Sequence, residues 1–216
     1  MIRLIILDFD GTLGDTRGNI VLTMRQTLQR LGYPELDEAT IAATIGVPLE
    51  KGFEQLLPGI SPDDHALCAR TYREIFEANR KILVPKAFPH VTETLAALQE
   101  AGFILSIASS RSSKSLKEFL RDMEIAPYIS YVLGADNVSR AKPHPEPVLK
   151  TMADLGFPAE ETLVVGDMPV DILMGKGAGT RTCAVTYGNG SRAELSAAGA
   201  DMVIDDFSEM LTLDLS

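Results

Sequence analysis

Two aspartates, Asp8 and Asp10, follow the apolar run Leu4-Ile5-Ile6-Leu7 near the start of the chain. An apolar run that stops abruptly at acids is typical of a buried strand, here over residues 2–9, so both carboxylates are expected at its carboxyl end. One carboxylate can act as a nucleophile and the other as an acid/base group if a cation offsets their repulsion. The alternative is a pair of loop acids that cap the next turn.

A second acidic pair, Asp167 and Asp171, follows the apolar segment 162–166. Asp171 lies one helical turn after Asp167, and Pro169 suits the first turn of a helix, so both carboxylates can face one point. Mg²⁺ takes few protein carboxylates and completes its shell with water and substrate oxygens, so acids from two strand ends suit it. A simple helix N-cap is the alternative for Asp167.

A lysine and two serines could bind an anion beside these acids. Lys142 lies between a loop and a helix start, where its ammonium could face a phosphate or screen the acids; an exposed lysine is the alternative. We expect the neighbouring His144 to be exposed and not a ligand. Ser109 and Ser110 end an apolar segment before a helix, so a hydroxyl and backbone N–H groups can bind an anion there, although serine is also a common cap.

The order of predicted elements places these residues on one edge of a sheet. Strands that alternate with helices predict an α/β fold, a Rossmann-like parallel sheet with helices on both faces, and ligands bind beyond the carboxyl ends of its strands. The strands are expected over residues 2–9, 103–108, 131–134, 162–166, 182–185 and 202–204, and the helices over 91–101, 113–123, 146–155, 170–178 and 192–198.

An all-helical segment interrupts this alternation after the first strand. From about residue 19 to 81 the apolar residues recur with a period near 3.6, Gly32 is a stop, and Asp37 and Ser61 are candidate N-caps. The sequence therefore predicts a core domain of residues 1–14 and 85–216 and a helical cap domain of residues 15–84. The cap would lie over the edge that carries the acids.

Composition excludes several function classes. The 216 residues contain 20 Lys+Arg against 30 Asp+Glu, a formal charge of −10 without basic clusters, which argues against nucleic-acid or membrane-surface binding. The first apolar run is too short for a signal peptide or a membrane span. Cys68 and Cys183 lack metal-binding spacing, so we expect two buried reduced thiols and a cytoplasmic protein.

Taken together, the motifs resemble those of the haloacid dehalogenase superfamily of phosphohydrolases. The matching segments are DFDGTLGDT (8–16), the strand end at Ser109, Lys142 in AKPHPEP and GDMPVD (166–171), and the resemblance covers essentially the whole chain. Members of the similar subgroup carry a helical cap after the first motif. The resemblance departs at Met168, where the family often has a small hydroxyl residue, and at Ser110-Arg111, where many phosphatases have Asn-Lys.

The resemblance implies a role for each matching residue. Asp8 would be the nucleophile that forms an aspartyl-phosphate, and Asp10 the acid that protonates the leaving oxygen and then activates water. Thr12 would position the phosphate, which Ser109, Ser110 and Lys142 would bind. Mg²⁺ would be held by Asp8, the backbone carbonyl of Asp10 and Asp167, with Gly11 and Asp171 in support.

The resemblance also ranks the substrates. Residues 46–57 are most similar to phosphoglycolate phosphatases, so the expected substrate is phosphoglycolate or a similar small phosphorylated metabolite, and the expected state is a monomer or weak homodimer. The alternatives are a phosphonate-cleaving relative using Lys51, a phosphosugar mutase, and a non-catalytic binding module. Gly188–Ala193 matches a dinucleotide fingerprint, but too few residues follow for a nucleotide-binding half, so we expect a mobile loop near the rim of the site.

Overall fold

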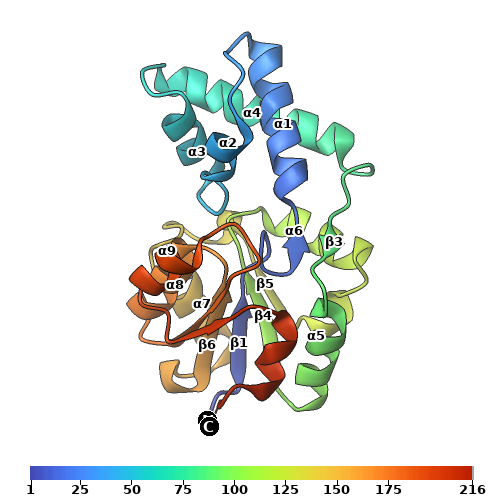
Figure 1. Ribbon diagram of the computed structural model, residues 1–216, viewed down its shortest axis with the longest axis vertical. Coiled ribbons are helices and arrows are strands. Elements are labelled where there is room, and N and C mark those ends of the chain that lie inside the picture. Colours follow the sequence, from blue (N-terminus) through green and yellow to red (C-terminus); the bar gives the residue numbers. More distant parts are fainter. Residues whose placement is uncertain (216) are drawn as a thin grey trace.

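The computed structural model describes residues 1–215, and a six-stranded parallel sheet forms its centre (Figure 1). The sheet has the order β5-β4-β1-β6-β7-β8, which confirms the predicted α/β fold. The strands are β1 (Leu4–Leu7), β4 (Ile104–Ala108), β5 (Tyr131–Leu133), β6 (Thr162–Gly166), β7 (Arg181–Val185) and β8 (Met202–Ile204).

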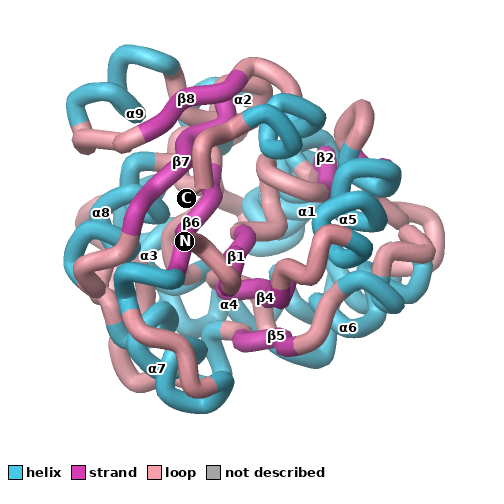
Figure 2. Tube along the Cα trace, turned by 90° about the horizontal axis from the view of Figure 1, so that it is seen from below, coloured by secondary structure: helices cyan, strands magenta, loops and turns pink. Residues whose placement is uncertain are grey.

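Helices cover both faces of this sheet (Figure 2). The core helices are α5 (Val91–Glu100), α6 (Ser113–Asp122), α7 (Glu146–Leu155), α8 (Pro169–Gly177) and α9 (Arg192–Ala197), with short 3₁₀ turns η1 (Ala126–Tyr128), η2 (Ala135–Asn137), η3 (Ala159–Glu161) and η4 (Phe207–Thr212). Alternate residues of β1 explain the two layers, because Ile5 and Leu7 belong to the cluster with α5 and α6, whereas Leu4 and Ile6 belong to the cluster with α7 and α8. The first strand is therefore apolar throughout because both of its faces are buried.

Four of the five helices between β1 and β4 form the predicted helical insertion, which lies beyond the carboxyl ends of the strands (Figure 1). They are α1 (Arg17–Leu31), α2 (Glu38–Ala42), α3 (Leu49–Leu56) and α4 (Pro62–Asn79). The predicted caps are present: the Asp37 side chain accepts from the backbone N–H of Thr40, and the Ser61 hydroxyl accepts from that of Asp64. Gly32 ends α1 with a left-handed φ of 76°. This architecture is that of a cap inserted into an α/β core.

The two chain crossings between the helical insertion and the core pair with each other. The short strands β2 (Gly14–Asp15) and β3 (Lys86–Ala87) are antiparallel, and the backbone N–H of Phe88 donates to the carbonyl of Leu13 over 3.0 Å. The sequence predicted no strand at either crossing, because two residues are too few for an alternating pattern. The domain boundaries at residues 14/15 and 84/85 stay a prediction, which this pairing supports.

Two further expectations concern the whole described chain. Cys68 and Cys183 are both buried and unpaired, as expected for reduced thiols. Within residues 1–215, none of the helices combines the length and the apolar character that a bilayer crossing requires.

Candidate active site

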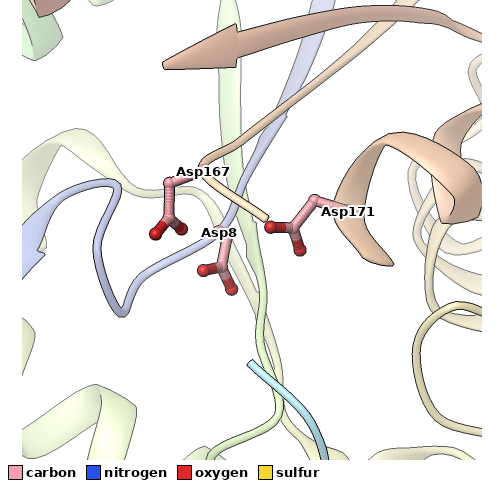
Figure 3. A group of neighbouring side chains, drawn as sticks. All are labelled: Asp8, Asp167 and Asp171. Carbon is pink, nitrogen blue, oxygen red and sulfur yellow. The ribbon is translucent and has the colours of Figure 1, made fainter. Parts of the chain in front are cut away.

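Three buried carboxylates gather at the carboxyl ends of two neighbouring strands (Figure 3). Asp8 follows β1, Asp167 follows β6, and Asp171 lies in the first turn of α8. Strands β1 and β6 are parallel neighbours, and the backbone N–H of Asp8 continues their pairing by donating to the carbonyl of Val165. One carboxylate oxygen from each aspartate lies within 4.8 Å of the others. The two acidic strand ends predicted from the sequence therefore meet.

Lys142 places one ammonium between two of these carboxylates. Its Nζ donates to Oδ1 of Asp8 over 2.5 Å and to Oδ1 of Asp171 over 2.6 Å, and its side chain is only 2% exposed. Burial opposes the charged form, but the Asp171 and Asp8 carboxylates outweigh it and raise the pKa of Lys142 above its usual value. The ammonium therefore stays charged, and Lys142 screens the acids as one of its two predicted roles.

One ammonium is too little to keep all three buried acids charged. Burial raises the pKa of Asp8 well above its usual value; Lys142 opposes this, and Asp171, Asp167 and Asp10 add to it. Burial and Asp171 raise the pKa of Asp167 to about 7, against hydrogen bonds from Asn189 and Thr12. A divalent cation would favour the charged forms of these acids, and buried carboxylate oxygens are the donors that a hard cation prefers, so the residues fit a metal site.

Asp167 is held by donors from two loops. The hydroxyl of Thr12 donates to its Oδ1 over 3.1 Å, and the backbone N–H and side-chain amide of Asn189 donate to its Oδ2 over 2.7 and 3.0 Å. Gly11, with a φ of 92°, permits this approach, because a Cβ there would lie 2.1 Å from Oδ2 of Asp167. Such partners orient a metal-binding carboxylate.

This arrangement adds to two sequence-based expectations. The Thr12 hydroxyl donates to Asp167, while its predicted role in positioning the phosphate stays a prediction. The loop that contains Asn189 was expected only near the rim, yet Asn189 contacts Asp167 directly and the N–H of Gly190 donates to the Asp167 carbonyl over 3.1 Å. An amide flanked by two glycines was the available signal, and the dinucleotide pattern in the same residues obscured it.

Asp10 points to a different partner from Asp8. Nε of Arg111 lies 2.8 Å from both carboxylate oxygens of Asp10, and both side chains are about nine-tenths buried. The carboxylate cluster thus contains Asp171 in place of the Asp10 side chain; the metal contact predicted for Asp10 uses its backbone carbonyl and stays a prediction. Arg111 was noticed in the sequence only as a departure from the family pattern.

The two predicted phosphate-binding serines differ in their contacts. Ser109 is buried at the end of β4, and its hydroxyl accepts from the backbone N–H of Arg111 over 3.3 Å. The Ser110 hydroxyl donates to the carbonyl of Gly46 in the helical insertion over 2.8 Å. Phosphate binding by both stays a prediction. His144 is half-buried, not exposed, and its Nδ1 accepts from the N–H of Glu146 at the start of α7.

A cavity of about 800 Å³ separates the helical insertion from the core beside this site. Asp10, Ser110 and Arg111 line it from the core, while the insertion supplies mainly apolar side chains, including Ile45, Val47, Leu49, Tyr72 and Phe76. Asp10 is thus the site acid among the residues that line the space between the two parts of the chain.

Comparison with known proteins identifies the family. Residues 5–185 match the haloacid dehalogenase-like hydrolase family. The chain belongs to this family. A crystal structure of a haloacid dehalogenase-like hydrolase from Bacteroides fragilis superposes with a TM-score of 0.93 at 28% identity, covering 97% of this chain and 100% of that one.

Curated relatives of this haloacid dehalogenase-like hydrolase are named as phosphatases. It is 40% identical to "Probable phosphatase IndB" of Dickeya dadantii over 96% of this chain and 91% of the relative. It is 34% identical to pyrophosphatase PpaX of Anoxybacillus flavithermus (98% and 96% covered) and 31% identical to phosphoglycolate phosphatase of Photorhabdus laumondii (98% and 92%). The chain is thus a haloacid dehalogenase-like phosphatase close to this subgroup.

Proposed function

We propose that this phosphatase is a Mg²⁺-dependent phosphomonoesterase that works through an aspartyl-phosphate on Asp8. The observation that carries the proposal is the buried bridge from Lys142 to Asp8 and Asp171, beside Asp167. A nucleophilic carboxylate needs a neighbouring positive charge when a phosphate approaches it, and this bridge supplies that charge at the strand end.

In the first step, an Asp8 oxygen attacks phosphorus, the bond to the leaving oxygen breaks, and protonated Asp10 gives its proton to that oxygen. In the second step, the Asp10 carboxylate takes a proton from water, whose oxygen attacks phosphorus and breaks the bond to Asp8. Ser109, Ser110 and Lys142 bind the phosphoryl oxygens. Asp8, Asp167 and the Asp10 carbonyl, with Asp171, would hold Mg²⁺, which supplies electrostatic stabilisation of the phosphoryl oxygens when bound.

We propose phosphoglycolate or a similar small phosphorylated metabolite as the substrate. Support comes from the relatives named phosphoglycolate phosphatase and from the cavity that leads away from Asp10. The acidic composition argues against nucleic-acid and membrane partners. A cytoplasmic location and a monomer or weak homodimer belong to the same proposal.

The alternatives gain no support from the structure. Lys51, the candidate Schiff-base lysine of a phosphonate-cleaving enzyme, is 65% exposed and pairs with Glu54 over 3.1 Å. Arg73, a cap cation at the cavity in which a mutase could bind a second phosphate, already pairs with Glu50 over 2.6 Å. A non-catalytic binding module would not need a buried lysine that bridges Asp8 and Asp171 beside Asp10 and Asp167.

The proposed function is tested by inorganic phosphate release from a panel of phosphomonoesters that includes phosphoglycolate. We expect release with Mg²⁺, none with a chelator, and none from Asp8→Asn at any metal concentration. Asp63→Asn, which changes an exposed aspartate in the first turn of α4, is the matched control and should behave as wild type. Release by Asp8→Asn at the wild-type rate would refute the nucleophile assignment.

A further inference from the structure

A row of aromatic rings crosses from the helical insertion to the first catalytic motif. Phe53 meets Tyr72 edge to face, Tyr72 stacks on Phe76, and Phe76 meets Phe119 of α6 edge to face with centroids 5.8 Å apart. Phe119 in turn stacks on Phe9 at 5.9 Å. Phe9 lies between Asp8 and Asp10 in the sequence, so the row ends on the residues that carry the proposed chemistry.

Arg111 packs against this row at Phe76 and Phe119, where the row passes from the insertion to the core. Its guanidinium carbon is 5.1 Å from the ring centroid of Phe76 and 5.0 Å from that of Phe119. The Arg111 side chain is only 11% exposed, and desolvation strengthens the attraction of its guanidinium to the two ring faces. Phe76 belongs to α4 and Phe119 to α6, so the place of Arg111 depends on both parts of the chain.

The same guanidinium holds the Asp10 carboxylate, through Nε at 2.8 Å from both oxygens. An aspartate side chain has two rotatable bonds, so its carboxylate would turn among several orientations if it had no partner. A general acid must lie within hydrogen-bond reach of the oxygen that it protonates. Whatever fixes Arg111 therefore also fixes the direction of Asp10.

We propose that Arg111 is a positioning residue for Asp10 and that Phe76 of the cap holds Arg111 in place, so that the seating of α4 on the core orients the catalytic acid. The inference rests on the proposed function, in which Asp10 protonates the leaving oxygen. Cap and chemistry are then linked by the contacts of Phe76, Arg111 and Asp10, independently of any substrate contact made by the cap.

Leaving-group dependence tests the role of Arg111. Ethoxide, the leaving group of ethyl phosphate, needs a proton to depart, whereas 4-nitrophenolate departs readily from 4-nitrophenyl phosphate without one. We compare kcat/KM, because it covers only the steps up to the aspartyl-phosphate and leaves out the hydrolysis step that both esters share. For Arg111→Gln we expect kcat/KM on ethyl phosphate to fall by about 10- to 100-fold, within the range of general acid catalysis, and kcat/KM on 4-nitrophenyl phosphate to change by less than about threefold. Arg111→Lys keeps the charge and should recover part of the loss.

A double-mutant cycle tests whether Phe76 acts through Arg111. Phe76→Leu should show the same leaving-group dependence with a smaller loss, and it should have no further effect in the Arg111→Gln background. Arg80→Gln is the matched control, because Arg80 also joins the end of the insertion to α6, through Glu118 at 3.4 Å and Asp122 at 3.3 Å, without an Asp10 contact. Arg80→Gln should change kcat/KM on the two esters by the same factor.

Several outcomes would overturn the inference while phosphatase activity remains. Equal losses of kcat/KM on the two esters would give Arg111 a purely structural role. A loss on phosphoglycolate without one on ethyl phosphate would make Arg111 a binding group for the substrate carboxylate. Additive effects of Phe76→Leu and Arg111→Gln would separate the cap from Asp10. Failure of the wild type to release phosphate from any ester would instead refute the proposed function itself.

Discussion

Nζ of Lys142 lies 2.6 Å from Oδ1 of Asp171, and both side chains are 98% buried. Lys142 lies in the loop before α7 and Asp171 in the first turn of α8, so the contact joins two neighbouring parts of the strand-end surface. The same ammonium also reaches Asp8. Its removal leaves three buried carboxylates without a cation among the contacts of residues 1–215.

Lys142→Met should destabilise the metal-free protein by about 3–5 kcal/mol, because breaking a buried ion pair leaves uncompensated charge. The free energy of unfolding is measured in urea with a chelator present, and added Mg²⁺ should restore part of the loss. Lys176→Met removes the half-exposed pair with Asp201 and should cost less than about 1 kcal/mol. Equal effects of the two substitutions would contradict the structural role of the buried ammonium.

The raised pKa of Asp167 predicts an unusual pH dependence of stability. The folded carboxyl has a pKa of about 7, above its usual 3.8, so the folded state keeps a proton that the unfolded state releases. The stability that this proton supplies is complete below about pH 4 and declines as pH rises towards 7. Above pH 7 it is lost.

The measurement compares wild type with Asp167→Asn in chelator between pH 4.5 and 8, a range chosen to span roughly this window. The stability of the wild type relative to the variant should fall as pH rises. With Mg²⁺ the wild type should instead gain stability with pH, since metal binding requires the carboxylate. Parallel profiles for the two proteins in chelator would show that Asp167 does not retain its proton.

Asn189→Ala should weaken metal activation. Loss of the amide that holds Oδ2 of Asp167 should raise the Mg²⁺ concentration for half-maximal activity by about 10-fold, a typical effect for a partner of a metal ligand, with little change in kcat at saturating metal. Asn79→Ala, which loses only a contact with Gln26 in the insertion, serves as the control. An unchanged Mg²⁺ dependence of Asn189→Ala would show that Asn189 does not support metal binding.

Much of the core could be predicted because burial on both faces leaves a clear signal. The continuous apolar run of β1 and the alternation of helices and strands predicted the sheet, and the acids at its strand ends predicted where Asp8, Asp167 and Asp171 meet. Parallel strands place their carboxyl ends on one edge, so no long-range information was needed. The caps Asp37 and Ser61 were predicted for the same local reason.

The missed features depend on tertiary contacts. The contact of Arg111 with Asp10 spans 101 residues, and nothing near Arg111 in the sequence indicates which acid it meets. Asn189 reaches Asp167 because a glycine-flanked loop folds back over β6. The Ser110 hydroxyl contacts Gly46 only because the cap lies over the sheet. Residue types alone predict the ligands of the site better than the residues that hold them.

The pairing of β2 with β3 holds together the two points at which the chain enters and leaves the helical insertion. Gly14 lies opposite Ala87 and Asp15 opposite Lys86, so the chain leaves the core and returns to it at adjacent points. The entropic cost of closing a loop rises slowly with loop length. A longer or shorter segment between β2 and β3 would therefore change the stability of the core little. In the proposed link from Phe76 through Arg111 to Asp10, an exchanged segment would have to supply its own contact to Arg111.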